Sequence, residues 1–392
     1  MRGHLTVIGV LLAGMAAGAH ALPVSPFDAQ DYTTTVTTVP WAQPPSDHHR
    51  LFLDVYNVTD IFDSETGGVA GFTDQTVLAD TVRPTATVLW DERFRIQLGA
   101  IAEKLYGDSV GFGKVDPWIQ LLWRPIQPLN VILGNLDIPH YYLPALFYPT
   151  NYFTRENHET GMQLKFERPE WFDDLYFNYR LQDTPDHNEK FDFGFVHRND
   201  WKWFSLIYQS HWIHEGGELN PHPLNTRNDV AQAGGLGVHG HPFGCASVMV
   251  GLDYTHLQSH VRQDSDTPAL LFTQNGHGEF SQAYVRWARL KVIGGDWRGH
   301  DYSHEGGDPM FTLPVMDMLT LRWDILQARD FNLFAETTGY VVGSNSQGYG
   351  HDVKAAFHIQ AAWQFSIPIV EWTSPAASSE GQPVPTRWDY GL

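Results

Sequence analysis

Eight basic side chains recur at positions from which their cations can share one surface. They are Arg93, Arg95, Arg124, Lys165, Arg198, Arg286, Lys291 and Arg322. Guanidinium groups bind carboxylate and phosphate in two-point contacts, and a ring of cations lining a pore attracts anions. The pattern predicts a basic lining that favours anionic solutes. The alternative is a structural network in which Glu167, Asp324 and Glu336 pair with these cations.

Serine and histidine suggest a second chemistry, which is hydrolysis. Ser205, Ser210 and His211 lie in one short segment and are candidates for a nucleophile and its base. The chain has no nucleophile-elbow motif and no paired-carboxylate motif around them. We therefore expect a protein that is not an enzyme, with a hydrolase as the alternative.

Two histidine pairs have spacings that a metal ion can use. They are His239 with His241, and His300 with His304. Neither pair comes with cysteine or with a helix that would place both rings on one face. The acidic group Asp301, Glu305 and Asp308 lacks the spacing of a calcium loop. We expect no bound metal and no cofactor.

The elements that position these residues are β-strands, because apolar and polar residues alternate with period two. Every even residue from Met162 to Phe166 is apolar and every odd residue from Gln163 to Glu167 is polar. Such a segment has one apolar and one polar face. The expected strands are 50–57, 83–91, 93–104, 117–124, 129–136, 160–167, 173–182, 190–198, 201–213, 229–239, 245–257, 279–287, 290–300, 316–326, 330–343 and 352–367.

The connections between these strands alternate between short and long. Short turns near 92, 125–128 and 199–200 separate longer connections such as 58–82 and 137–159. An up-and-down outer-membrane barrel has short periplasmic turns and longer outside loops. We expect an all-β fold, a transmembrane antiparallel barrel of about sixteen strands. A soluble β-sandwich is the structural alternative.

The first residues predict export. Arg2, the apolar run from Leu5 to Ala17 and the small-residue site at Ala19-His20-Ala21 are typical of a signal peptide. We expect a signal peptide at 1–21, a periplasmic segment at 22–49, a barrel at 50–367 and a flexible periplasmic tail at 368–392. With 45 acidic against 25 basic residues the net charge is −20, which argues against nucleic-acid binding. Cys245 is the only cysteine, so no internal disulfide can form.

In this organisation, residues 50–367 resemble the outer-membrane porin-like barrels. The resemblance implies a protein of the cell outer membrane, recognised by the barrel assembly machinery, and leaves a homotrimer open. It also implies that the third outside connection, 137–159, folds into the lumen as a constriction. The residues of that segment singled out on this basis are Tyr141, Tyr142, Phe147, Tyr148, Tyr152, Phe153 and Arg155. The alternative is that this segment covers the rim or contacts lipopolysaccharide.

The expected function is a channel that passes small polar solutes, anionic ones among them, or an exported polysaccharide. Outer-membrane lipids and lipopolysaccharide are the expected surroundings. An outer-membrane lipid-modifying hydrolase with a site at the rim is one alternative. A plugged barrel with a structural or adhesion role is the other.

Overall fold

The computed structural model describes most of the chain between residues 48 and 373. The gaps within that range are 66–73, 91–92, 108–111, 127, 138–142, 148–157, 169, 218–223, 243–246, 266–270, 329–330 and 344–351. The predicted signal peptide, most of the predicted segment 22–49 and the tail from 374 onward lie outside the described residues.

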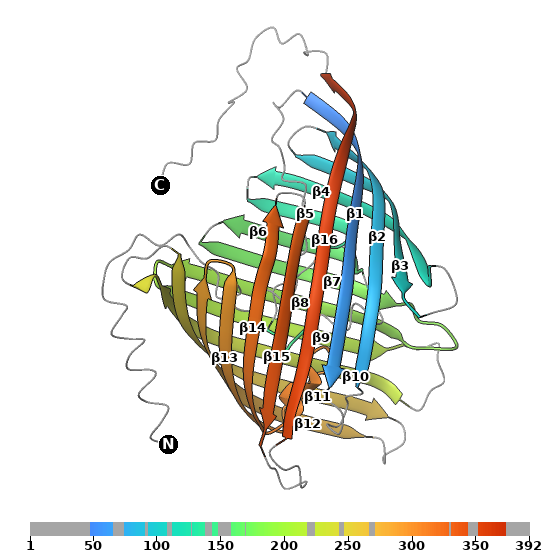
Figure 1. The fold of residues 1–392 in the computed structure, drawn as a ribbon. Coiled ribbons are helices and arrows are strands. Elements are labelled where there is room, and N and C mark those ends of the chain that lie inside the picture. The colour runs from blue at the N-terminus through green and yellow to red at the C-terminus, as the bar shows by residue number, and fades with distance from the viewer. Residues whose placement is uncertain are drawn as a thin grey trace.

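Sixteen antiparallel strands form one closed barrel, in which each strand pairs with its neighbours in sequence and β1 pairs with β16 (Figure 1). The up-and-down barrel expected from the sequence is confirmed. The strands are β1 (His48–Glu65), β2 (Gln75–Trp90), β3 (Phe94–Leu105), β4 (Lys114–Ile126), β5 (Leu129–Asn135), β6 (Thr160–Arg168), β7 (Trp171–Leu181), β8 (Glu189–Trp201), β9 (Phe204–Gly216), β10 (Leu224–Gly240), β11 (Val248–Ser265), β12 (Phe272–Trp287), β13 (Leu290–His300), β14 (Val315–Ala328), β15 (Phe331–Val342) and β16 (Asp352–Thr373).

Several strands extend beyond the ranges expected from alternation. β1 reaches Glu65 instead of 57, β11 reaches Ser265 instead of 257, and β16 reaches Thr373 instead of 367. Outward residues such as Arg262, near the end of β11, are polar, so the alternation fades while backbone pairing continues. β9 starts at Phe204 instead of 201, because Lys202 adopts a left-handed backbone with φ 47° and closes the turn there.

The two faces of each strand differ in the way a membrane barrel requires. On β9, Phe204 and Tyr208 point outward and are exposed, whereas Ser205, Gln209 and His211 point inward and are buried. Large exposed tryptophans gather outside, next to the short turns, where an interfacial girdle is expected. They are Trp90, Trp123, Trp171, Trp201, Trp203, Trp287 and Trp323.

Both ends of the sheet lie on the same side of the barrel, because the number of strands is even. The start of β1 and the end of β16 lie together in Figure 1. The short turns are on this side, so it faces the periplasm, and the long connections face the cell exterior. The protein is thus an outer-membrane barrel with a defined inner and outer end.

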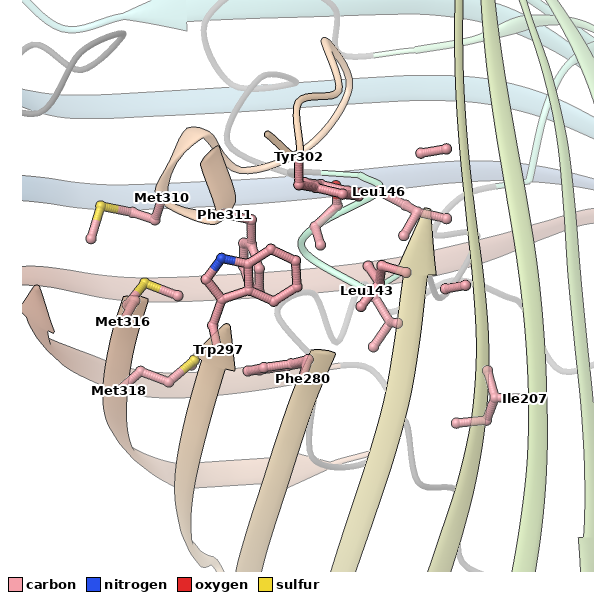
Figure 2. Packing of buried hydrophobic residues seen from close by; sticks show 14 of the residues in the cluster. Leu143, Leu146, Ile207, Phe280, Trp297, Tyr302, Met310, Phe311, Met316 and Met318 are labelled. Atoms are coloured by element: carbon pink, nitrogen blue, oxygen red, sulfur yellow. The ribbon is translucent and has the colours of Figure 1, made fainter. Parts of the chain in front are cut away.

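Two outer connections fold into the lumen and pack there as a hydrophobic core (Figure 2). Leu143 and Leu146 come from the β5–β6 connection, and Tyr302 and Phe311 from the β13–β14 connection. They pack with inward side chains of the wall around Trp297. The Trp297 indole donates a hydrogen bond to the Leu313 carbonyl at 2.8 Å. Where these connections lie, the interior along β7–β15 is therefore a packed protein core.

No helix among the described residues is long and apolar enough to cross a membrane.

Replacing Trp297 with alanine tests this internal core. Trp297 is fully buried and contacts Phe311 and Tyr302 edge-on, so its loss should lower the free energy of unfolding by about 3–5 kcal/mol. Trp287→Ala is the matched control, because that side chain is 62% exposed on the lipid face. Urea unfolding in detergent, followed by heat-dependent gel mobility, gives the comparison. Equal effects of the two substitutions would contradict an internal core.

Candidate functional site: a buried histidine pair at the outer end of the lumen

Seven of the eight basic residues singled out from the sequence lie on inward strand faces; Arg93 lies exposed in the β2–β3 turn. Five of the seven inward cations, namely Arg95, Arg124, Lys165, Arg198 and Arg322, contact acids or amides. Lys165 lies 3.0 Å from Asp137, Arg198 lies 2.9 Å from Asp200, and Arg322 lies 3.0 Å from Asp324. The other two acids expected in a structural network lie farther from their cations, with Lys165 and Glu167 3.8 Å apart and Arg322 and Glu336 3.9 Å apart. A lining that selects anions stays a prediction.

The pair of Asp137 and Lys165 is stabilised by further charges around it. Burial raises the pKa of the Asp137 carboxyl, but Lys165 and Arg95 outweigh burial and hold that pKa below its ordinary value. Lys165 also donates a hydrogen bond to this carboxylate. The β5–β6 connection is thereby tied to the wall at its first residues.

The predicted constriction segment is described only in part. Phe147 is half-buried and packs against the internal core, while Tyr141, Tyr142, Tyr148, Tyr152, Phe153 and Arg155 lie outside the described residues. The neighbouring residues 143–146 are buried inside the barrel. The Leu143 amide donates to the Gln209 side chain of β9 at 2.8 Å. This part of the segment therefore lies in the lumen.

The serine and histidine candidates do not meet one another. Ser210 points outward, whereas Ser205 and His211 point inward, six residues or about 20 Å apart along β9. Ser205 instead contacts His239, with its Oγ 3.2 Å from the His239 Nδ1. This pair lies at the periplasmic end, beside the β8–β9 turn.

His211 meets a different partner at the outer end of the lumen. Its Nδ1 lies 2.9 Å from the Nε2 of His304, and the His304 Nδ1 lies 2.7 Å from an oxygen of Asp229. On the other side, the His211 Nε2 lies 3.9 Å from Asp192, whose carboxylate also contacts Arg180 at 3.3 Å. The relay Asp229–His304–His211–Asp192 joins β10, the β13–β14 connection, β9 and β8.

The protons carried by the His211 and His304 rings determine the chemistry that this relay can perform. Two neutral imidazoles carry two N–H groups, one each. The His304 Nδ1–H donates to Asp229, and the His211 Nδ1–H faces the His304 Nε2 and, at 3.1 Å, the Leu146 carbonyl oxygen. In the neutral pair the His211 Nε2 therefore carries a lone pair, and the carboxylate of Asp192, 3.9 Å away, stabilises the cation that forms when this nitrogen takes up a proton. Such a pair is suited to act as a general base.

Two glycines allow the β13–β14 connection to reach the relay. A Cβ on Gly306 would lie 2.7 Å from the His211 ring, and a Cβ on Gly307 would lie 2.1 Å from the Ala145 carbonyl oxygen. The Tyr302 hydroxyl donates to the same Ala145 carbonyl at 3.0 Å. The two inserted connections therefore hold one another against His211.

A charged group at the rim lies next to the relay. The Glu305 carboxylate contacts Lys190 of β8 and, at 3.0 Å, Arg227 of β10. The Glu305 amide donates to Asp229 at 2.8 Å, so the backbone is held by the relay itself. The relay is fully buried, whereas Lys190, Arg227 and Glu305 are partly exposed.

The histidine pairs considered for metal binding do not form metal sites. His239 points inward, and His241 lies in the turn, 2.8 Å from the Val248 carbonyl. His300 is exposed and stacks on His277, whereas His304 is buried in the relay. Within the described residues, no group of three or more His, Cys, Asp or Glu side chains could hold a metal ion.

Sequence reasoning found parts of the relay without connecting them. His211 was a candidate for hydrolysis and His304 for metal binding, but Asp229 and Asp192 were not singled out. The four residues come from separate strands and one connection, so no short motif records them. The one available signal was parity, which places Asp192, His211 and Asp229 on inward faces.

These features define an outer-membrane β-barrel with a partly filled lumen and a buried acid–histidine relay at its outer end. The chain belongs to the Lipid A 3'-O-deacylase-type family, whose model matches residues 43–333. The expectation that the protein is not an enzyme is therefore wrong, because the family is described by a deacylase activity. The matched region contains His211, His304 and both carboxylates of the relay.

Among curated proteins, no sequence matches this chain. Solved structures of similar fold include Pseudomonas putida OprB, at 8% identity and TM-score 0.47, covering 81% of this chain and 94% of that one. A loop-deletion mutant of Vibrio cholerae OmpT has 10% identity and TM-score 0.46, with coverage of 81% and 99%. The anion-selective porin of Comamonas acidovorans has 11% identity and TM-score 0.45, with coverage of 81% and 99%. At these scores they add nothing to what the strand pairing establishes.

Asp308 should make the β13–β14 connection sensitive to pH. Burial raises the pKa of this carboxyl to about 7, although the Met310 amide, which donates to it, opposes the rise. The folded state then binds more protons than the unfolded state between about pH 4 and pH 7. The stability of this connection should fall by roughly 4 kcal/mol across that window and stay low above it.

Asp308→Asn keeps the acceptor for the Met310 amide and removes the titration. Hydrogen exchange of residues 302–313, corrected for intrinsic rates, should accelerate from pH 5 to pH 8 in the wild type. It should stay unchanged in the variant. The same acceleration in both proteins would show that another group is responsible.

Proposed function

We propose that this protein hydrolyses an ester-linked acyl chain of a lipid A-type glycolipid, and that His211, His304 and Asp229 transfer the proton. The observation that carries the proposal is the relay itself, in which two histidines in direct hydrogen-bond contact lie between two carboxylates. Its position supports the proposal, because lipid A lies in the outer leaflet and the relay lies at the outer end of the lumen. The family match supports the same reaction class.

In the proposed reaction, water attacks the ester carbonyl and gives up a proton to the histidine pair. The lone pair on the His211 Nε2 takes up this proton. Asp229 and Asp192 stabilise the resulting cation, as carboxylates do for an imidazolium. The pair then returns the proton to the leaving sugar oxygen, so the ester and water become a fatty acid and a free hydroxyl.

Substitutions in the relay test the assignment. His304→Gln and Asp229→Asn should each lower kcat/KM by about 10²–10⁴. The measurement is mass spectrometry of fatty acid released from lipid A in detergent micelles, and heat-dependent gel mobility confirms that each variant is folded. Ser205→Ala removes the serine–histidine contact at the periplasmic end and should leave the rate unchanged. Loss of activity in Ser205→Ala with normal activity in His304→Gln would overturn the assignment.

Passage of polar solutes is a second candidate function, favoured by the polar inward faces around β1–β5. Arg83 lies between the Tyr56 and Trp118 rings, 4.6 and 4.1 Å from their centroids, and Arg95 donates to Gln120 at 2.9 Å. Small polar or anionic solutes, or an exported polysaccharide, would follow this side of the lumen. Lipopolysaccharide contact, recognition by the barrel assembly machinery and a homotrimer remain parts of this proposal.

Single-channel recording in a planar bilayer tests the second candidate. Conductance steps with a preference for anions are expected, and neutralising Arg124, Arg198 and Arg286 together should reduce that preference several-fold. Each of the three lies on an inward strand face. An absence of steps, or a preference for cations that persists in the triple variant, would exclude an anion pathway.

A further inference from the structure

The charged group beside the relay is placed where a substrate headgroup would arrive. Lys190 and Arg227 project from two strands, separated by β9, and both contact one carboxylate, that of Glu305. Glu305 lies on a connection that enters from the rim, directly after the relay residue His304. Two cations that converge on one anion form a site for any anion of suitable shape.

From this geometry we infer that Lys190 and Arg227 form a phosphate-binding subsite, which the Glu305 side chain occupies when no ligand is bound. The inference rests on the proposed function, because it names the part of the glycolipid that this end of the lumen recognises. Lipid A is a phosphorylated, acylated disaccharide, so a phosphate held beside His304 brings ester-linked chains close to the relay. A phosphate carries more charge than a carboxylate and accepts more hydrogen bonds, so it competes well for these cations.

The backbone around Glu305 allows this exchange without dismantling the relay. The Glu305 amide is held by Asp229, and the same carboxylate holds His304. Gly306 and Gly307, the next two residues, pack against the His211 ring and the Ala145 carbonyl. Only the Glu305 side chain has to rotate outward, and it is already 28% exposed.

Two further acids lie beside the two cations. Lys190 also lies 3.8 Å from Glu215, and Arg227 lies 3.8 Å from Asp229. These acids stay in place when Glu305 leaves and repel any anion, so a ligand has to offset the repulsion through direct contacts to both cations, which a phosphate with several acceptor oxygens can make. A neutral sugar would gain nothing from displacing Glu305.

Binding measurements on the full-length protein in detergent test the subsite apart from catalysis. The probes are inorganic phosphate, phosphorylated lipid A and enzymatically dephosphorylated lipid A, followed by calorimetry or thermal shift. Phosphorylated lipid A should bind at least tenfold more tightly than the dephosphorylated form. Binding of inorganic phosphate alone, without that difference, would overturn a lipid-headgroup subsite.

Three variants connect the binding to the named residues. Glu305→Gln removes the competing charge and should tighten binding of inorganic phosphate about tenfold, whereas Lys190→Gln with Arg227→Gln should abolish it. Arg262→Gln is the matched control, because this arginine pairs with Asp264 on the outer surface of β11 and should change nothing. Unchanged affinity in Glu305→Gln, or persistent binding in the double variant, would overturn the inference.

This test separates the inference from the proposed function. If phosphorylated lipid A binds as described but is never deacylated, the subsite stands and the hydrolase proposal falls. If deacylation occurs at equal KM with and without the phosphate, the subsite falls and the hydrolase proposal stands.

Discussion

The pairing of β1 with β16 is the contact on which the rest of the structure depends. In hydrocarbon every backbone N–H and C=O needs a partner within the protein, so a sheet in the membrane has to close. The closing pair runs from His48 opposite Thr373 to Glu65 opposite Ala355. Closure fixes which residues face lipid and which face inward, and it sets the width of the interior that side chains and connections then fill.

Side chains and inserted connections fill the interior of the barrel unevenly around its circumference. Along β7–β15 the inserted connections pack on Trp297 and its neighbours, while the faces around β1–β5 carry arginines, glutamines and asparagines. The buried relay lies at the boundary between core and rim, where the core excludes water and the strands supply acids. Burial in such surroundings strengthens each charge contact, because little water remains to screen it.

The family match adds an enzyme to the porin-like architecture of the barrel. The porin-like resemblance was correct for architecture, since membrane closure imposes the same alternation whatever the lumen does. It did not indicate an enzyme, because nothing in the lipid-facing pattern depends on the chemistry inside. The relay depends instead on inward residues of three strands and on a connection, and no short motif records their combination.

The sequence by itself determined the strand parity, the rhythm of short and long connections and hence the barrel. These follow from short-range rules, since alternate side chains of a strand always point to opposite faces. The same alternation places Asp192 on the polar face of its strand. Only the tertiary structure decided that His304 meets His211 across 93 residues, because that contact depends on how a long connection packs. The contact forms because Gly306 lets the connection pack closely against the His211 ring. Local sequence preferences do not specify such packing.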